Sequence, residues 1–215
     1  MSTVLLLLRD ARVADHLRDT IAAEPGLDVV GSATTLAQAR EILARITPDI
    51  VVADLLLPDG NLRPLLNQLR DKAGDAGPSV LVLSMSAEDV RLVDALRQGA
   101  VGYFAVGRSQ TTLVGAIEQV LNGESPMSPQ IARAVKAHFD GMTRDATDFV
   151  AEAQNPLRLR DADQQLLQRT AEGYVISEVA HHLQASEHEV GVRMRNIYRK
   201  LQFDLRADAL TLNLF

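Results

Sequence analysis

The sequence contains no cysteine among its 215 residues. This absence excludes disulfide bonds, thiolate zinc sites and cysteine nucleophiles. Long apolar runs are also missing. The run near the N-terminus, VLLLL at residues 4–8, is far too short to span a membrane, and it has no basic leader or small-residue cleavage site. We therefore expect a cytoplasmic protein that makes no membrane contact.

The sequence also lacks the patterns that many enzymes carry. It has no glycine-rich nucleotide loop and no evident Ser/His/Asp arrangement, so we expect no enzymatic activity. The composition is that of an ordinary globular protein, with 47% hydrophobic and 23% charged residues, in a chain long enough for two small domains. The net charge of −6 does not favour nucleic acid binding, although a whole-chain charge can hide a local basic face.

The N-terminal part, residues 1–122, alternates between two periodicities. Short apolar runs rich in β-branched residues are separated by amphipathic stretches with helical spacing. Apolar strands that alternate with helices are typical of a parallel sheet covered on both faces. We therefore predict an α/β doubly wound domain with a five-stranded parallel sheet. The expected strands are residues 4–8, 27–31, 49–53, 79–84 and 101–106.

The remainder of the chain is predicted to be helical. Ser128 and Pro129 make a good N-cap and first turn, so we expect a helix from Pro129 to about Phe139. Residues 140–157 have little apolar periodicity and are typical of an interdomain linker. From Leu159 onward, four short helical pieces with a serine cap indicate an all-α helix-turn-helix domain. The expected division is 1–122, then 123–157 (extra helix and linker), then 158–215.

Three polar residues stand where predicted strands end: Asp10, Asp54 and Ser84. In an open parallel sheet, ligands bind beyond the carboxyl ends of the strands, so we expect these side chains to converge on one crevice. Two carboxylates in a polar pocket suit Mg²⁺. A carboxylate can also accept a phosphoryl group. The alternative is that Asp54 is only a turn residue, because aspartate often ends a strand by bonding nearby backbone N–H groups.

The motifs DLLLPDG at 54–60, SMSAED at 84–89 and GAVGYF at 99–104 resemble the receiver domain of bacterial two-component response regulators. With the C-terminal module, nearly the whole chain resembles their NarL/FixJ class. The resemblance implies that Asp54 accepts phosphate from a histidine kinase. It also implies that the Ser84 side chain moves toward the bound phosphate, and that Tyr103 is the aromatic residue that rotates inward together with Ser84.

Two residues depart from the receiver pattern. The family has two adjacent acids after its first strand, whereas this chain has Arg9 and Asp10. The family also has a lysine after its fifth strand, where this chain has Val106. Losing one metal ligand and gaining a cation should leave the Mg²⁺ site of Asp10 and Asp54 weak or absent. We therefore expect no required cofactor, a pairing of Arg9 with one of the two acids, and no conventional histidine kinase partner.

The segment 160–201 resembles the LuxR-type DNA-binding domain. The resemblance rests on AEG at 171–173, Ser186-Glu187, Asn196-Ile197 and Arg199-Lys200-Leu201. It implies that the protein binds double-stranded DNA as a homodimer, with the last helix, residues 206–215, at the dimer contact. The apolar residues at helical spacing should form the core. These are Leu166, Leu167, Val179, Leu183, Val190, Ile197 and Leu201.

The C-terminal half of the recognition segment is rich in basic residues, whereas its N-terminal half has few. Phosphate contacts and base readout need basic and polar side chains on the outer face of the recognition helix. The candidate DNA-binding residues are His188, Arg193, Arg195, Arg199 and Lys200. Three features disfavour DNA binding by this segment. Glu187 and Glu189 repel phosphates, and Gly191 weakens the helix. Residues 156–215 also contain equal numbers of acidic and basic residues.

Three functional hypotheses follow. The leading one is a DNA-binding transcription regulator whose receiver works without ordinary Mg²⁺-dependent phosphorylation and acts through protein contacts. The second is a conventional regulator switched by phosphorylation of Asp54. The third is a protein-interaction scaffold that has lost DNA binding.

Overall fold

The computed structural model describes residues 1–73, 77–84, 91–106, 112–145 and 159–212. The strands are β1 (Ser2–Leu7), β2 (Leu27–Ala33), β3 (Ile50–Asp54), β4 (Leu56–Leu57), β5 (Gly60–Asn61), β6 (Ser79–Ser84) and β7 (Gly102–Ala105). The helices are α1 (Ala11–Ala22), α2 (Leu36–Leu43), α3 (Arg63–Ala73), α4 (Arg91–Gln98), α5 (Leu113–Leu121), α6 (Pro129–Asp145), α7 (Asp161–Glu172), α8 (Ile176–Leu183) and α9 (Glu187–Leu212).

The N-terminal part forms a five-stranded sheet in the order β2-β1-β3-β6-β7, and all its strand pairs are parallel. This is the doubly wound arrangement, in which the strand order reverses between β1 and β3. The predicted fold class is confirmed. A small antiparallel hairpin, β4–β5, follows directly after Asp54.

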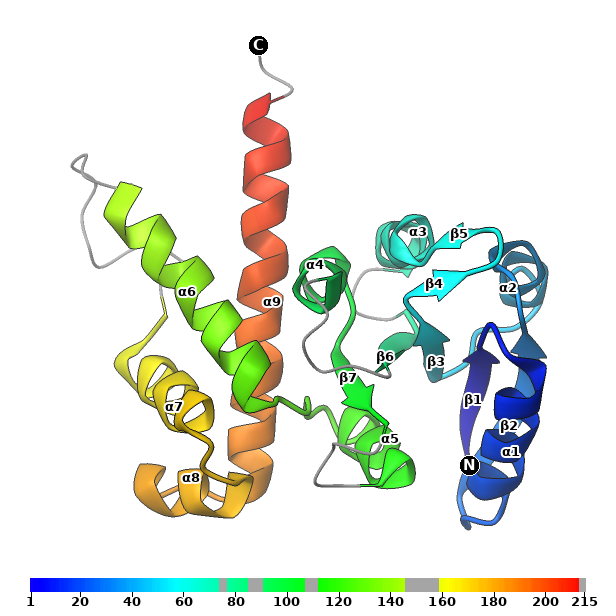
Figure 1. Ribbon diagram of the computed structural model, residues 1–215, viewed down its shortest axis with the longest axis horizontal. Helices are drawn as coiled ribbons and strands as arrows, with labels where there is room; N and C mark the ends of the chain where they lie inside the picture. Colours follow the sequence, from blue (N-terminus) through cyan, green and yellow to red (C-terminus); the bar gives the residue numbers. More distant parts are fainter. Residues whose placement is uncertain (74–76, 85–90, 107–111, 146–158, 213–215) are drawn as a thin grey trace.

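Helices cover both faces of this sheet (Figure 1). Successive residues of a strand point to opposite faces, so each central strand contributes to two cores. Val51 packs in the cluster that includes α2, α3 and α4, whereas Val52 packs in the cluster that includes α1 and α5. Both residues are fully buried, which explains why the strands are apolar throughout.

Helix α6 is longer than the sequence predicted. It continues to Asp145 instead of ending near Phe139, so the expected linker begins six or more residues later. A single exposed glycine does not stop a helix, and Lys136 pairs with Asp140 one turn away at 2.7 Å. Ile131, Val135 and Phe139 are buried in one cluster with α7, which gives α6 an apolar side to pack. Residues 146–158 of the expected linker lie outside the described residues.

The prediction of four short helical pieces after Leu159 was wrong. The last two pieces are one helix, α9, which runs from Glu187 to Leu212. The reason is visible in the sequence: neither glycine nor proline occurs after Gly191, so no residue punctuates the helix. The expected dimer contact at 206–215 falls on residues whose side chains are not described.

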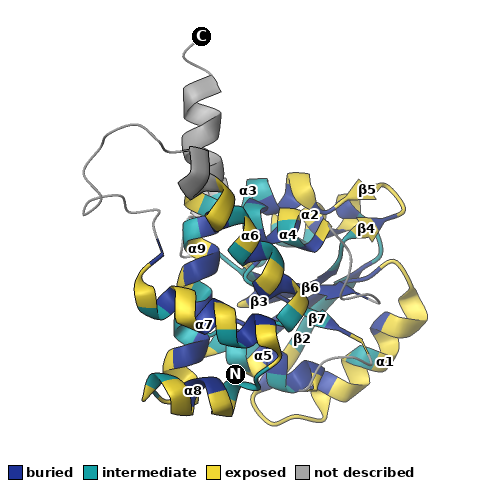
Figure 2. Ribbon diagram, turned by 60° about the vertical axis from the view of Figure 1, so that its left-hand side comes forward, coloured by how far each residue is buried: buried dark blue, intermediate teal, exposed yellow. Residues whose placement is uncertain are grey.

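Helix α9 lies against the receiver-like domain, beside α4 (Figure 1). One buried cluster contains residues of the sheet, Tyr103 of β7 and residues of α6, α7, α8 and α9. Figure 2 shows buried residues, in dark blue, on both the sheet and the C-terminal helices. Gln202 of α9 fixes this contact, because its Nε2 donates to the carbonyls of Leu96 and Ala100 at 3.0 and 3.1 Å. The Leu96 carbonyl belongs to the last turn of α4, where helix carbonyls lack intrahelical partners, and the Ala100 carbonyl lies just after the helix ends. Among the described residues, no helix is long and apolar enough to cross a membrane.

Candidate phosphoacceptor pocket and recognition helix

Asp54 lies at the carboxyl end of β3 and is held mainly by a backbone group. The amide nitrogen of Arg9 donates to its Oδ2 at 2.9 Å, whereas the Arg9 Nε is 3.9 Å from the same oxygen. The Arg9 side chain is 60% exposed, so the ion pair contributes little. Burial raises the pKa of Asp54, and the charge of Asp10 adds to this, while the amide and charge of Arg9 oppose it. The expected pairing of Arg9 with Asp54 therefore exists, but chiefly through the amide.

Asp10 serves as the N-cap of α1. Its Oδ1 accepts from the amide nitrogen of Arg12 at 2.9 Å. A resident Mg²⁺ would need oxygens from Asp10 and Asp54, yet each acid already gives one oxygen to a backbone N–H. The Arg9 guanidinium beside them also opposes a divalent cation. The donor set therefore fits Mg²⁺ poorly, and no group of three or more acids or histidines arranged for a metal occurs in the part of the chain that the structure describes.

The other pocket residues stand at the ends of β6 and β7. Ser84 ends β6 and is buried, and its carbonyl accepts from the amide nitrogen of Val106 at 2.9 Å. Val106 is 39% exposed and brings no charge to the pocket. The hairpin after Asp54 has a structural task, because Asp59 accepts from the amides of Leu36 and Ala37 at 2.8 and 3.0 Å. These bonds cap α2 and lower the pKa of Asp59.

Tyr103 faces the C-terminal helices. Burial raises its pKa, and hydrogen bonds with Ser128, the residue before α6, oppose that rise. Tyr198 of α9 is completely buried nearby, and its hydroxyl donates to the carbonyl of Pro126 at 3.1 Å. Burial raises the pKa of Tyr198, and Tyr103 contributes to the rise. The receiver residue implied as a rotating aromatic thus contacts the start of α6 beside α9.

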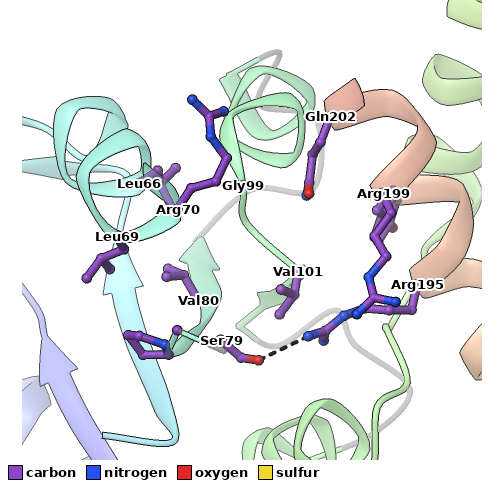
Figure 3. Close-up of a pocket in the computed structure, with 13 residues that line it drawn as sticks. Leu66, Leu69, Arg70, Ser79, Val80, Gly99, Val101, Arg195, Arg199 and Gln202 are labelled. Atoms are coloured by element: carbon purple, nitrogen blue, oxygen red, sulfur yellow. Dashed lines mark hydrogen bonds between the residues drawn. The ribbon is translucent and has the colours of Figure 1, made fainter. Parts of the chain in front are cut away.

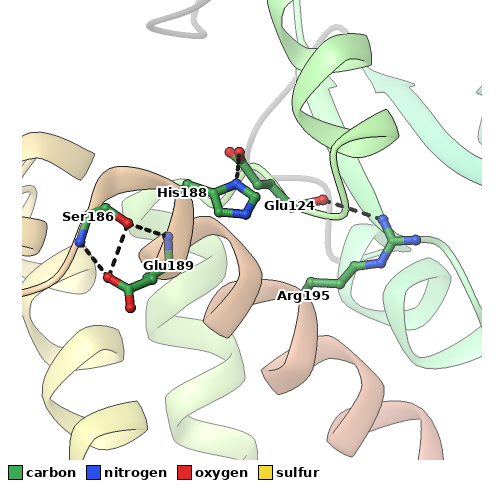
Figure 4. Close-up of polar contacts among 5 residues, drawn as sticks. All are labelled: Glu124, Ser186, His188, Glu189 and Arg195. Carbon is green, nitrogen blue, oxygen red and sulfur yellow. Dashed lines mark hydrogen bonds and ion pairs between the residues drawn. The ribbon is translucent and has the colours of Figure 1, made fainter.

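The predicted serine cap at the start of the recognition helix is confirmed. The turn between α8 and α9 passes through Gln184 in the left-handed conformation, and Ser186 then caps α9. Glu189 completes a capping box, because its carboxylate accepts from the Ser186 amide at 2.7 Å (Figure 4). These bonds lower the pKa of Glu189. Of the seven predicted core residues, six are fully buried, and Leu183 is half-buried against them.

Two predicted DNA-binding side chains bond to the turn after α5. His188 Nδ1 lies 2.7 Å from the Glu124 carboxylate (Figure 4). Arg195 donates to the Glu124 carbonyl at 3.4 Å and to the Ser79 hydroxyl at 3.0 Å. The recognition helix therefore turns these groups toward the receiver-like domain.

The other predicted side chains differ in their surroundings. Lys200 pairs with Asp163 of α7 at 2.8 Å, and both side chains are largely buried, so this lysine joins two helices of the module. Arg199 is exposed and lines a cavity against the receiver-like domain. Arg193 is half-buried and lies near Glu189, whose pKa its charge helps to lower. Their role in DNA contact stays a prediction.

At Gly191 the backbone of α9 lies close to the turn after α5. A Cβ atom there would lie 2.8 and 2.9 Å from the Cγ and Cβ of Glu124. The Gly191 carbonyl accepts from the amide nitrogen of Ser125 at 3.1 Å. The sequence interpretation missed Glu124, Ser125 and Gln202 as contact residues. The glycine inside a helix was the available signal, since such a glycine often marks close approach of another backbone.

The fold joins a receiver-type sheet, with an acid at its carboxyl edge, to a helix-turn-helix. These two features define the class of protein. Residues 5–118 match the family model described as "Response regulator receiver domain". The DNA-binding transcriptional activator DevR/DosR of Mycobacterium tuberculosis is 31% identical over 90% of this chain and 85% of its own length. The nitrate/nitrite response regulator NarL of Escherichia coli is 27% identical over 97% and 93%.

Solved structures agree with this class. A LuxR-family two-component response regulator from Aurantimonas sp. is 30% identical, with a TM-score of 0.57 over 64% of this chain and 97% of its own. RcsB of Salmonella enterica, in a complex with promoter DNA, has a TM-score of 0.55 over 94% of this chain and 92% of its own; at 18% identity it shows the fold alone. The chain belongs to the response regulators, in their NarL/LuxR class.

Proposed function

We propose that this protein is a transcription regulator that binds double-stranded DNA as a homodimer through α9, and that its receiver restrains α9 by direct contact. The relative DevR/DosR is named as a DNA-binding activator, and the helix-turn-helix supplies the corresponding surface. The proposal includes that the protein acts in the cytoplasm and has no enzymatic activity.

The single observation that carries this proposal is the position of the basic face of α9. His188 and Arg195 bond to Glu124, and Arg195 also reaches Ser79. A side chain bonded to the receiver cannot at the same time contact DNA phosphates or bases. DNA and the receiver therefore compete for one surface, and release of α9 is the regulated step.

The Asp54 pocket supports a switch other than ordinary Mg²⁺-dependent phosphorylation. The acid that would share a metal with Asp54 caps α1, Arg9 places a cation beside them, and Val106 carries no charge to pair with a phosphoryl group. A protein or small-molecule contact that disfavours the docked form would release α9 without that chemistry. A conventional histidine kinase is accordingly not part of the proposal.

DNA binding is tested with the full chain and labelled fragments of its own genome, by fluorescence anisotropy at several salt concentrations. Arg193→Met should weaken binding and lower the slope of log affinity against log salt by about one, the change that one lost phosphate contact gives. The matched control is Arg12→Met, on the exposed side of α1. If no fragment binds, and a variant with α9 released does not bind either, the scaffold hypothesis replaces this one.

A further inference from the structure

Helix α6 follows the receiver in the chain, but it packs mainly against α7. Figure 1 shows α6 beside α7, outside the layers that cover the sheet. Ile131 and Val135 of α6 are buried in one cluster with Leu166 and Leu167 of α7. The contact of α6 with α4 of the receiver is smaller. The apolar packing therefore associates α6 with the C-terminal helices.

A polar contact joins the same two helices. The guanidinium group of Arg133 in α6 donates to the carbonyl of Ala171 at 2.5 Å. This carbonyl belongs to the last turn of α7, where helix carbonyls lack intrahelical partners. Separation of α6 from α7 would break this bond and would expose apolar side chains of both helices to water, which is unfavourable.

The turn before α6 is held by the receiver instead. Ser125 is buried, and its hydroxyl donates to the carbonyl of Val101, just before β7. Pro126 lies against Gly102, where an added Cβ would be 2.9 Å from the Cδ of the proline ring. These contacts fix residues 125 and 126 beside the edge strand of the sheet.

Release of α9 breaks the same bonds wherever α6 goes. These include the bond from Arg195 to the Ser79 hydroxyl at 3.0 Å (Figure 3) and the bonds from Gln202 to the receiver. If α6 stayed on the receiver, its apolar packing on α7 would be lost as well. If α6 leaves, the smaller contact with α4 and the bonding of Ser128 with Tyr103 are lost. A hydrogen bond that breaks is replaced by one to water, whereas exposed apolar surface gains no such replacement, so departure of α6 costs less.

We propose that α6 leaves the receiver together with α7, α8 and α9, as one unit that pivots at Met127 and Ser128. This rests on the proposed function, in which release of α9 is the regulated step. A few residues at the end of an element absorb the dihedral changes of a domain movement, and these two directly precede Pro129, the first residue of α6. The moving unit thus begins near residue 127 and not in the expected linker at 140–157.

Pulsed electron paramagnetic resonance on the full-length chain tests this directly. The chain contains no cysteine, so spin labels attach only at cysteines that are introduced. One labelled pair, Arg63→Cys with Ala137→Cys, spans the receiver and α6. The other pair, Ala137→Cys with Gln165→Cys, spans α6 and α7, and all three positions are exposed. Each pair is measured in the wild-type background and in Gly191→Ala/Gln202→Ala, which should loosen the docking of α9.

In the loosened background, a second, longer distance should appear for the receiver–α6 pair, while the α6–α7 pair keeps its single distance. Gln130→Ala/Gly141→Ala is the matched control and should leave both distances unchanged. A second distance for the α6–α7 pair would overturn the proposal, because α6 and α7 would then separate. Unchanged distances in both pairs would also overturn it, because no unit would leave the receiver. If no DNA binds in any condition, the proposed function fails, while the distances still decide which helices move together.

Discussion

The carbonyl of Gly191 in the recognition helix accepts a hydrogen bond from the amide of Ser125 in the turn after α5, at 3.1 Å. This contact brings the backbone of a helix-turn-helix against the backbone of a receiver. A helix interior seldom offers room for such an approach, and here the missing side chain of Gly191 provides it. The same glycine that weakens the helix therefore allows α9 to dock.

Gly191→Ala should loosen the docking of α9. The new Cβ would meet Glu124 at less than 3.0 Å, and overpacking of this kind costs about 1–3 kcal/mol. Alanine also favours a helix over glycine by about 1 kcal/mol, and this gain applies to docked and released α9 alike. Hydrogen exchange of the Ser125 amide should become faster. Gly141→Ala in α6, where the Cβ meets open space, gains the same helix propensity and should leave Ser125 protected.

Gln202→Ala should weaken the same docking from its other end. The substitution removes two hydrogen bonds, one to the last turn of α4 and one to Ala100 just after it, at a cost of about 1–2 kcal/mol. Exchange at the Ser125 amide, which makes no hydrogen bond with Gln202, should rise as in Gly191→Ala. Gln130→Ala, at an exposed position of α6, is the control. An unchanged Ser125 amide would mean that the two ends of the contact are independent.

Asp54→Asn should stabilise the protein at neutral pH. Burial raises the folded-state pKa of Asp54, so the folded protein holds this proton more tightly than the unfolded chain. Stability is consequently lost as the pH rises from the ordinary carboxylate pKa through the raised one. Asparagine keeps the acceptor for the Arg9 amide without the charge. The melting temperature of Asp54→Asn should exceed that of wild type at pH 7. This gain should vanish when the pH falls below the pKa that Asp54 has in the unfolded chain. A constant gain at all pH values would refute this origin.

Lys200→Met should act on stability rather than on DNA contact. It leaves Asp163, whose side chain is 12% exposed, without the ammonium group at 2.8 Å. Methionine retains the apolar stem, so the loss of about 2–3 kcal/mol in unfolding free energy comes from the stranded carboxylate. Chemical denaturation measures this. Arg193→Met should cost less than Lys200→Met, because its half-buried side chain lies near the exposed Glu189, and exposed ion pairs contribute at most about 1 kcal/mol. If Arg193→Met lost more unfolding free energy than Lys200→Met, the prediction that Lys200 stabilises the fold would be wrong.

The sheet was predictable because its pattern is redundant. Strand segments buried on both faces, such as residues 50–53 of β3, must be apolar at every position, and helices must then cover them. The core of the helix-turn-helix was predictable for a similar reason, since Val190, Ile197 and Leu201 recur at helical spacing. The carboxyl edge of the sheet likewise placed Asp54 near Asp10, whose charge reaches it.

The contacts between the two parts were not predictable, because they depend on how two finished surfaces meet. Lys200 has the residue type of a DNA-contacting side chain, yet it pairs within its own module. Tyr103 carries no sequence signal that it bonds to Ser128. The predicted length of α6 was wrong for a different reason. Asp140 and Gly141 are residue types common in linkers, but α6 accommodates both on an exposed side.

The most direct test of this account is the DNA affinity of the full-length protein with and without beryllofluoride in millimolar Mg²⁺, for wild type and Gly191→Ala. If docking on the receiver restrains α9 and ordinary phosphorylation does not release it, Gly191→Ala should bind DNA more tightly than wild type. Beryllofluoride should then change the DNA affinity of neither protein. The opposite result would contradict it: beryllofluoride tightens DNA binding by wild type, Asp54→Asn abolishes that response, and Gly191→Ala binds DNA no better than wild type.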